Sequence, residues 1–554
     1  MDARFIGFGG ARFLFIDDVL GSWGHGRYGR LGGKGESLSG MGRAFSGQSA
    51  RRFSSIVGAS IVQASASGKG IGGNQMAGKA GLPKPKSSPL RRIATPLALL
   101  LALVVGVVCA AIEPAAALPS FARQTGQPCA TCHTAFPQLT PYGRRFKLMG
   151  YTTTGGQYAF PPYPPVALML QSGFTHTNAN LGPQGGGFST PNNWADLAQQ
   201  TSVFWGGKIT DHLGAFVQTT LSNDGAGVAF GWDNSDIRYA DTASVAGHDA
   251  IWGLDFNNNP TIQDPWNTTS AWSWPFIASA FQPSPYAATL FDGPFGGLLG
   301  PGNAVSAGGY VFIEDSYYAE LSLYKTPSYS LQNHLGVCCA TDLLSNNITF
   351  DGPAPYWRFA VEKNIGEQSI MVGTYGMLAN VIPNNIGGMG TDKYWDEGFD
   401  SQYQWIHDRH AVTLRANYVI ERQQFGNSFF SQGLTSNPVD YLRSLKLQGE
   451  YVYDNTYAFS AGYFNISGTP DAGIYQAIGP NGNPSPNSAG WIFDASFLPF
   501  SHGGPGVWPW MNTRIGVSYT MFTKLDGLTK DVDGTPGLNA SGNNTLFLYA
   551  FTMF

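Results

Sequence analysis

The clearest candidate chemistry in the sequence lies in Cys129-Ala130-Thr131-Cys132-His133, a C-x-x-C-H motif. This motif attaches a covalent c-type haem, because two thiols form thioethers with the haem vinyl groups and the adjacent histidine reaches the iron. A C-x-x-C pair alone is also compatible with zinc or a disulfide. The histidine that follows, and the export signal described below, favour haem. We therefore expect one covalent haem c, held by Cys129 and Cys132, with His133 as the proximal ligand of the iron.

The distal iron ligand has several candidates. Met149 is the nearest downstream thioether, and its spacing from His133 allows a short loop or turn to return it to the haem. Thioether ligation raises the reduction potential, which would suit a high-potential donor. We take Met149 as the candidate distal ligand, with a core filler as the alternative; Met169 and His176 are weaker candidates. Nearby basic residues could pair with haem propionates or form a solvated rim: Arg123, Arg144, Arg145 and Lys147.

No other catalytic motif is evident in the sequence. Five histidines fall mostly in turns or loops and are expected to be solvated: His212, His334, His407, His410 and His502. A group of loop residues could meet cations, although solvation is the default expectation: Asp255, Asn257, Asn258, Asn259 and Asp264. The adjacent Cys338 and Cys339 are interpreted as loop cysteines, with a strained disulfide or a metal site as alternatives.

Charge divides the chain into two unlike parts. Residues 118–554 contain 18 Lys and Arg against 31 Asp and Glu, a net charge of −13. This acidic balance disfavours nucleic acid as a partner and allows cationic ones. Over the whole chain 14% of residues are aromatic and 12% are charged, and glycine occurs 72 times. Such a composition favours many strands and turns over a soluble helical enzyme.

Residues 76–117 have the features of a signal peptide. Basic residues from Lys79 to Arg92 precede the apolar stretch Ile93–Ile112, and Ala115-Ala116-Ala117 supplies a cleavage site. We expect the mature chain to begin at Leu118 and interpret residues 1–75 as a misassigned N-terminal extension. The alternative, in which Ile93–Ile112 remains as a membrane anchor, is disfavoured by Pro96 and the small residues after it. Export is consistent with haem attachment, which in bacteria takes place outside the cytoplasm.

Beyond Val166 the dominant pattern is an alternation of apolar and polar residues, which is typical of strands with two different faces. Within residues 410–422, Val412 and Leu414 alternate with Thr413 and Arg415. The same alternation recurs in residues 357–362, 445–453 and 514–521. Runs of about 10–12 residues have the length of tilted membrane-spanning strands and exceed that of ordinary sandwich strands.

The connections predict the same architecture. Tight links near 210–213, 364–368, 407–409 and 454–455 alternate with long polar loops near 180–198, 258–302, 327–354, 381–396, 423–439, 468–488 and 525–542. Short periplasmic turns and long outer loops are typical of outer-membrane barrels. Inspection gives about 15 strands, and the alternation requires one more near 303–313. Residues 166–554 are therefore predicted to form an antiparallel transmembrane β-barrel of about 16 strands, with both ends on the periplasmic side.

The end of the chain agrees with this prediction. Phe554 follows the uncharged stretch Thr545–Phe551 and looks like the C-terminal assembly signal of outer-membrane barrels. Scattered Tyr and Trp residues are expected to form girdles at the membrane interfaces.

The haem segment, residues 118–165, resembles the fused monohaem cytochrome–porins of bacterial outer membranes, the group that includes outer-membrane iron(II)-oxidising cytochromes. The resemblance lies in Phe121-Ala122-Arg123, Cys129 to His133, Phe136-Pro137-x-Leu139 and Gly143-Arg144-x-Phe146-Lys147-x-x-Gly150-Tyr151. It covers the haem segment closely and the barrel in layout only. It implies a 16-stranded barrel whose lumen holds the haem segment as a plug. So short a segment buries too little surface to be stable alone, so we expect it to rest on the barrel.

These observations lead to a hypothesis of outer-membrane electron transfer. Single electrons would pass from an extracellular donor through the haem to a periplasmic c-type cytochrome. Fe(II) is the candidate donor, and iron(II):cytochrome c oxidoreductase is the possible enzyme class. The barrel would contact outer-membrane lipid, and acidic residues at its opening would attract cations. The alternative is a solute porin in which the haem segment is a plug or redox gate. A soluble periplasmic haem enzyme, such as a peroxidase, is disfavoured because the sequence has one haem motif and no second site with catalytic residues.

Overall fold

The computed structural model describes residues 7–8, 11–12, 119–155, 165–181, 188–190, 192–223, 228–272, 274–286, 288, 290–291, 304–334, 349–383, 388–475, 483–504, 511–532 and 536–554. The chain divides into two units, residues 1–86 and 87–554. In the first unit the described residues form the antiparallel pair β1 (Gly7–Phe8) and β2 (Ala11–Arg12). The predicted signal peptide, together with Cys109, Cys338 and Cys339, lies outside the described residues.

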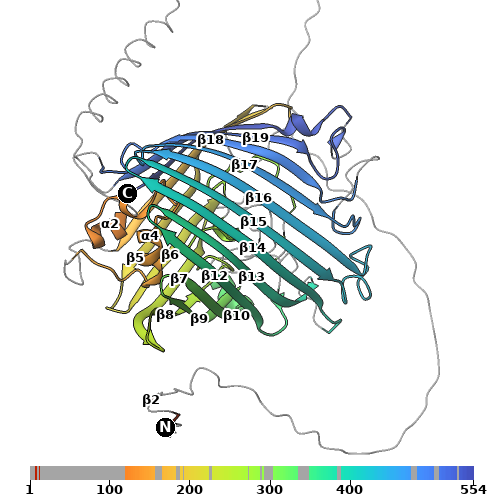
Figure 1. Ribbon diagram of the computed structural model, residues 1–554. Helices are drawn as coiled ribbons and strands as arrows, with labels where there is room; N and C mark the ends of the chain where they lie inside the picture. Colours follow the sequence, from red (N-terminus) through yellow and green to blue (C-terminus); the bar gives the residue numbers. More distant parts are fainter. Residues whose placement is uncertain are drawn as a thin grey trace, which may run out of the picture. The chain divides into compact units, whose positions relative to one another are not determined.

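The second unit contains a closed antiparallel barrel (Figure 1). Its 16 strands in the described part of the chain are β3 (Val166–Thr177), β5 (Asn193–Lys208), β6 (Leu213–Asn223), β7 (Val228–Val245), β8 (His248–Asn257), β9 (Val305–Ile313), β10 (Tyr317–Lys325), β12 (Ala354–Ile365), β13 (Gln368–Ile382), β14 (Asp392–His407), β15 (His410–Gln424), β16 (Val439–Tyr453), β17 (Tyr457–Gly468), β18 (Ser488–Phe497), β19 (Asn512–Lys524) and β20 (Thr545–Met553). Each pairs with its neighbours in the chain, and β20 closes the ring on β3. The short strands β4 (Phe188–Thr190) and β11 (Thr349–Phe350) add to β5 and β13.

The predicted fold class is confirmed, including the additional strand near 303–313, which is β9. The barrel also begins and ends on the same side as the tight turns, since Leu168 and Phe554 exchange backbone hydrogen bonds of 2.7 and 2.9 Å. Two predicted loops are shorter than expected: β5 already begins at Asn193 and β14 at Asp392. In β14 the first residues include Lys393 and Glu397 on the outward face and Asp396 on the inward face, so an apolar–polar alternation is hard to recognise there.

The outer face of the barrel is apolar where β14, β15 and β16 run next to one another. Along β16 the outward residues are Tyr441, Arg443, Leu445, Leu447, Gly449, Tyr451 and Tyr453, while the intervening side chains are buried. Glu397 on β14 is outward and lies level with Arg443 through Ile420 of β15, and the outward Arg422 lies one outward position further toward the long loops, level with Tyr441. These charged residues mark the end of the apolar band on that side. A closed ring with an apolar exterior leaves no backbone edge in hydrocarbon, as membrane-spanning strands require. The fold is therefore that of an outer-membrane β-barrel.

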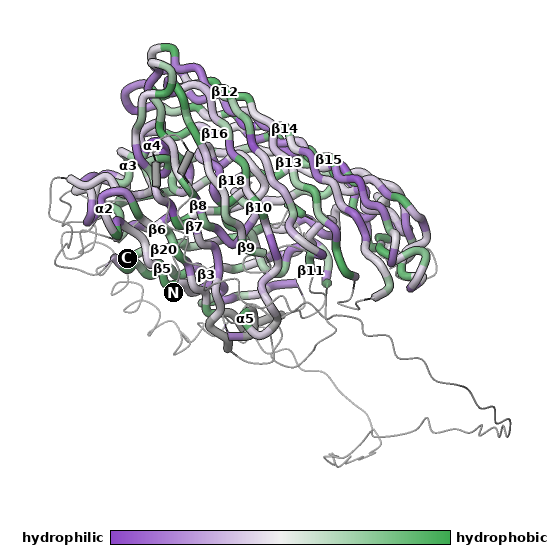
Figure 2. Tube along the Cα trace, turned by 90° about the horizontal axis from the view of Figure 1, so that it is seen from below, coloured by the Kyte–Doolittle hydropathy of each residue, from purple (hydrophilic) through white to green (hydrophobic). Residues whose placement is uncertain are grey.

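The predicted haem segment forms three short helices at the short-turn end of the barrel: α2 (Pro119–Thr125), α3 (Cys129–Cys132) and α4 (Pro141–Leu148). They lie beside β5 and β6, close to the C-terminus (Figures 1 and 2). Helix α4 starts where Thr140 caps it by accepting from the Gly143 amide, with Pro141 in the first turn. The helix is followed by Gly150 at φ +63°, a left-handed conformation that favours glycine. We call residues 119–155 the plug.

The remaining described helices are short. They are α5 (Tyr329–His334) and the 3₁₀ turns η2 (Ser270–Trp272) and η6 (Ala540–Asn543). In the described part of the chain no helix has both the length and the apolar character needed to cross a membrane.

Candidate functional site

One turn of helix places the two thiols of the motif together. Cys129 and Cys132 are the first and last residues of α3, and residues three apart lie on the same face of a helix. The His133 amide donates to the Cys129 carbonyl at 2.8 Å, and the chain then leaves the helix in an extended conformation. Cys132 is a free thiol. Burial raises the pKa of the Cys132 thiol to about 12.

The ring of His133 is oriented by a backbone carbonyl. Its Nδ1 lies 3.2 Å from the Gln138 carbonyl oxygen, and a carbonyl accepts only, so Nδ1 must carry the proton. This leaves the lone pair on Nε2, the arrangement that fixes the tautomer of a metal-binding histidine. Burial lowers the pKa of His133 to about 4, opposed by the backbone hydrogen bonds of Gln138 and Pro137. The ring is therefore neutral at pH 7, as an iron ligand must be.

Cys132 and His133 line a cavity of about 460 Å³ inside the barrel, within the usual range of ligand sites, about 300–1,000 Å³. Its apolar wall combines plug, strand and loop side chains: Phe121, Phe136, Leu139, Phe146, Met169, Phe204, Phe216, Ile262, Phe276, Ile277, Phe551 and Met553. Amide side chains are also present: Gln171, Gln199, Gln200, Gln218, Asn234 and Asn267. Cys129 is buried and its Sγ accepts from Asn512 Nδ2 at 2.9 Å. A neutral imidazole, an adjacent thiol and an apolar wall with polar groups fit a covalent haem, whose ring is apolar and whose propionates are charged.

Met149 does not contribute to the lining of this cavity. It follows α4 directly and packs against the buried cluster around Leu148, Trp266 and Tyr310. Two other methionines, Met169 and Met553, do line the cavity. The second weak candidate, His176, instead places its Nδ1 2.7 Å from Asn193 Oδ1.

The basic residues of the plug bind the barrel and the loop inside it. Arg144 donates to Glu362 at 2.6 Å, to Ser369 at 3.0 Å and to Gln404 at 3.1 Å, all on the barrel wall. Arg123 donates to the Val166 carbonyl. The exposed Arg145 pairs with Asp315 at 2.9 Å. Arg123 and Arg144, and Lys147 as described below, therefore bind the rest of the protein, whereas Arg145 is solvent-exposed.

Neutral and acidic groups complete the seat of the plug. Gln138 donates to Glu450 at 2.7 Å, and Tyr151 donates to Asp236 at 2.7 Å. The carbonyl oxygen of Gly150 approaches β6 so closely that a Cβ on Gly214 would collide with it. The expectation that the segment rests on the barrel is therefore met by polar contacts on several strands, as well as by ring packing such as Phe136 against Phe551 at 5.2 Å.

The long connection between β8 and β9 folds into the lumen. We call residues 258–286 the lumen loop, of which residue 273 is not described. Its side chains contact inward residues around much of the ring: Gln263 donates to Glu320 of β10, Trp266 to Glu362 of β12, and Thr268 to Asp400 of β14. On the opposite side, Ser279 lies 2.5 Å from Thr175 of β3. The sequence predicted an outer polar loop here, and this prediction was wrong about its position.

The predicted cation-binding residues form hydrogen bonds or ion pairs with other residues of the protein. Asp264 lies 3.0 Å from Arg358, which also pairs with Asp400 at 2.8 Å, and all three are fully buried. Asp255 and Asn257 belong to β8, and Asn257 Nδ2 donates a hydrogen bond to Asp255 Oδ2 at 2.8 Å. Among the described residues, no group of three or more His, Cys, Asp or Glu side chains is arranged to hold a metal ion.

The lumen loop and the plug also hold each other. Lys147 donates to the carbonyl oxygens of Ile262 and Asp264 at 2.8 and 2.7 Å, and its ammonium lies 4.6 Å from the ring centre of Trp272. In return Asn267 donates to the Pro137 carbonyl at 3.2 Å. Burial lowers the pKa of Lys147 to about 7, and the hydrogen bonds to these acceptors offset only part of the cost of placing a charge there.

The solvated histidines were predicted more successfully. His212, His407 and His502 lie at the short-turn end and pair with carboxylates of Asp241, Glu367 and Asp454 at 3.6, 2.5 and 3.4 Å. Their side chains are about half exposed. Such pairs on a surface contribute little to stability.

Comparison with known proteins does not assign the chain to a family. No family model and no curated protein matches the chain. Among solved structures it is similar to OmpT of Vibrio cholerae, with 9% identity, a TM-score of 0.34 and coverage of 70% of this chain and 97% of that one. It is also similar to the outer membrane channel DcaP of Acinetobacter baumannii, with 11% identity, a TM-score of 0.38 and coverage of 70% and 96%. The assignment as an outer-membrane barrel rests on the hydrogen-bonded strand order and the apolar exterior of this chain.

Proposed function

We propose that this protein is an outer-membrane electron-transfer cytochrome–porin. A covalent haem c on Cys129 and Cys132, ligated by His133, accepts single electrons from an extracellular donor and passes them to a periplasmic c-type cytochrome. The observation that supports this most directly is the orientation of His133. Its Nδ1 is committed to a backbone carbonyl, and the residue lines an apolar cavity together with Cys132. Few other roles explain such an imidazole next to the thiols of Cys129 and Cys132 inside a barrel.

The haem would supply reversible one-electron chemistry, and the chain's own residues would supply its placement. The plug holds the motif at the short-turn end, within reach of a soluble periplasmic partner. The lumen loop lies across the barrel beside the cavity and is held by buried ion pairs. This packing supports electron conduction more than solute flow. With Fe(II) as the candidate donor, the net negative charge of residues 118–554 would favour approach of the cation.

The cofactor and the electron transfer are tested in sequence. Protein purified from outer membranes is assayed for covalent haem by its pyridine haemochrome spectrum after acid–acetone extraction, with Cys129→Ala/Cys132→Ala as the variant that cannot attach haem. We expect one haem per chain in the wild type and none in the variant. The oxidised protein is then mixed anaerobically with Fe(II), and reduction is followed in the visible spectrum. Absence of covalent haem would refute the whole proposal, whereas haem that Fe(II) does not reduce would refute only the choice of donor.

A solute porin remains the second candidate, and the barrel fold itself favours it. Conductance in planar bilayers separates the two. We expect the wild type to show small or no open currents, and deletion of residues 266–279 from the lumen loop to increase them several-fold. Arg145→Met, at an exposed ion pair of the plug, is the control and should leave the conductance unchanged. Large currents through the wild type would support the porin instead.

A further inference from the structure

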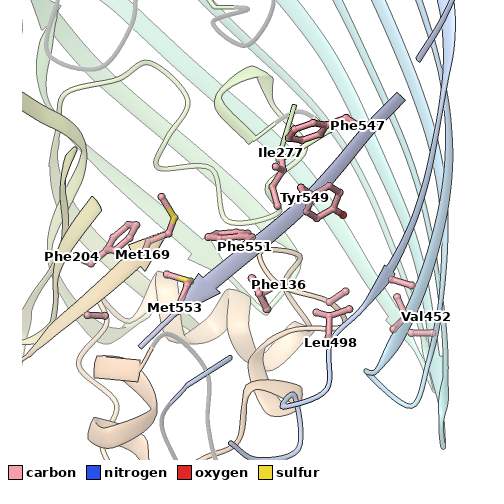
Figure 3. Close-up of a cluster of buried hydrophobic side chains, with 14 residues drawn as sticks. Phe136, Met169, Phe204, Ile277, Val452, Leu498, Phe547, Tyr549, Phe551 and Met553 are labelled. Atoms are coloured by element: carbon pink, nitrogen blue, oxygen red, sulfur yellow. The ribbon is translucent and has the colours of Figure 1, made fainter. Parts of the chain in front are cut away.

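Two methionine side chains from the barrel wall meet beside the plug. Met169 on β3 and Met553 on β20 are paired residues across the seam that closes the barrel. Both point inward and are buried, with 4% and 9% of their surface exposed. Their side chains gather with Phe551 and with Phe136 of the plug (Figure 3). Both line the same cavity as Cys132 and His133.

The other potential iron ligands around the cavity are already engaged. The Lys147 ammonium is held by two carbonyl oxygens and by Asn267 at 3.3 Å. Asp236 accepts from Tyr151 and from Arg238 at 2.8 Å. By contrast, Met169 Sδ has only a long contact of 3.9 Å from Gln171 Nε2. Thioethers are neutral and soft, so they can ligate haem iron from an apolar wall without the cost of a buried charge.

We propose that the Met169–Met553 pair supplies the distal thioether ligand of the haem. This inference rests on the proposed function and replaces Met149 as the candidate. It means that the two axial ligands come from different parts of the fold, His133 from the plug and the thioether from the barrel wall. The distal ligand is then available only when the plug is seated and β20 has closed on β3.

The test compares Met169→Leu, Met553→Leu, the double variant and the control Met149→Leu. Leucine conserves volume closely at buried methionine positions, so large packing effects are not expected. Haem content is measured first by the pyridine haemochrome, and barrel folding by the heat-dependent shift in gel mobility. The diagnostic signal is the weak sulfur-to-iron(III) charge-transfer band in the far-red absorption of the oxidised protein. Magnetic circular dichroism of the wild type reports the same ligand without any substitution.

We expect the wild type and Met149→Leu to show the band, and the double variant to lose it while keeping its haem. One single variant should lose the band, which assigns the ligand, and its reduction potential should fall because the thioether is gone. A band that survives in the double variant, or that disappears in Met149→Leu, would overturn the inference. A wild type with covalent haem but no thioether signature would overturn it as well while leaving the proposed function intact. A wild type without haem would instead refute the proposed function.

Discussion

The guanidinium of Arg144 lies 2.6 Å from the carboxylate of Glu362, although the two residues are 218 positions apart in the chain. Arg144 belongs to plug helix α4 and Glu362 to strand β12. The same carboxylate accepts from Trp266 of the lumen loop at 2.6 Å and from Ser369 of β13 at 2.8 Å. One buried carboxylate therefore connects the plug, the lumen loop and the barrel wall.

Removing Arg144 should leave Glu362 as an uncompensated buried charge. We expect Arg144→Met to lower the unfolding free energy by about 3–5 kcal/mol, the usual effect of breaking a buried pair. Urea unfolding followed by the fluorescence of the chain's 14 tryptophans measures this loss of stability. The double variant Arg144→Met/Glu362→Gln should recover part of the loss, since no buried charge remains. Arg145→Met, at an exposed pair on the same helix, should change stability by at most about 1 kcal/mol. Equal effects of the two single arginine variants would contradict this account.

Gly143 permits the close approach of α4 to the haem motif. A Cβ at this position would collide with the Cys132 carbonyl oxygen and press on the Leu139 side chain. We expect Gly143→Ala to displace α4 from α3 and to reduce the yield of covalent haem by severalfold, measured as haem per chain. Gly366→Asn is the matched control, because Gly366 has φ +59° and open space around it, and asparagine tolerates that conformation. Unchanged haem content in Gly143→Ala would show that the motif does not depend on this contact.

The lipid-facing band makes a prediction that does not depend on haem. Leu447 faces outward within the apolar stretch of β16 and is 43% exposed. Placing an arginine near the bilayer midplane costs about 2–4 kcal/mol, against about 0–1 kcal/mol near the interface. We therefore expect Leu447→Arg to destabilise the barrel more than Tyr453→Arg at the short-turn end of the same face. Refolding into lipid vesicles at increasing urea concentrations measures both. Similar costs at the two positions would place the membrane elsewhere along the strands.

Local patterns in the sequence were sufficient to predict the barrel, and the assignment of haem to the C-x-x-C-H motif stays a prediction. Alternation reports which residues face opposite sides, and so the outward row containing Val412 and Leu414 was found correctly. It does not report whether the inner face meets water or protein. Arg358 and Glu362, for example, alternate with apolar residues of β12, but nothing in that pattern indicates that they are buried against the lumen loop. A polar loop that folds inward has the same composition as one that stays outside, because its polar groups bond to an equally polar wall.

The residues that meet around the cavity could not be predicted from local sequence patterns, for a different reason. Met169 and Met553 are neighbours only because β20 pairs with β3 in a particular register. Sequence spacing therefore favoured Met149, which is near His133 along the chain. Helix α4 instead carries its C-terminal end into the cluster with Tyr310, whose hydroxyl donates to the Leu148 carbonyl at 2.5 Å. The only signal that could have found the pair is the placement of both methionines at the barrel seam, each within a few residues of the end of its strand.

The contacts between Lys147 and the lumen loop have a mechanical consequence. A force that pulls the plug toward the periplasm would be resisted by the lumen loop as well as by the contacts of α4 with the barrel wall. It would pass through the loop carbonyls of Ile262 and Asp264, then through Arg358 to strands β12 and β14. The loop is anchored at the far end of β8 and β9, so the load would be shared across the height of the barrel. A plug held in this way is expected to stay in place under load, which is what the proposed electron transfer requires and what a solute porin that opens by withdrawing its plug would not require.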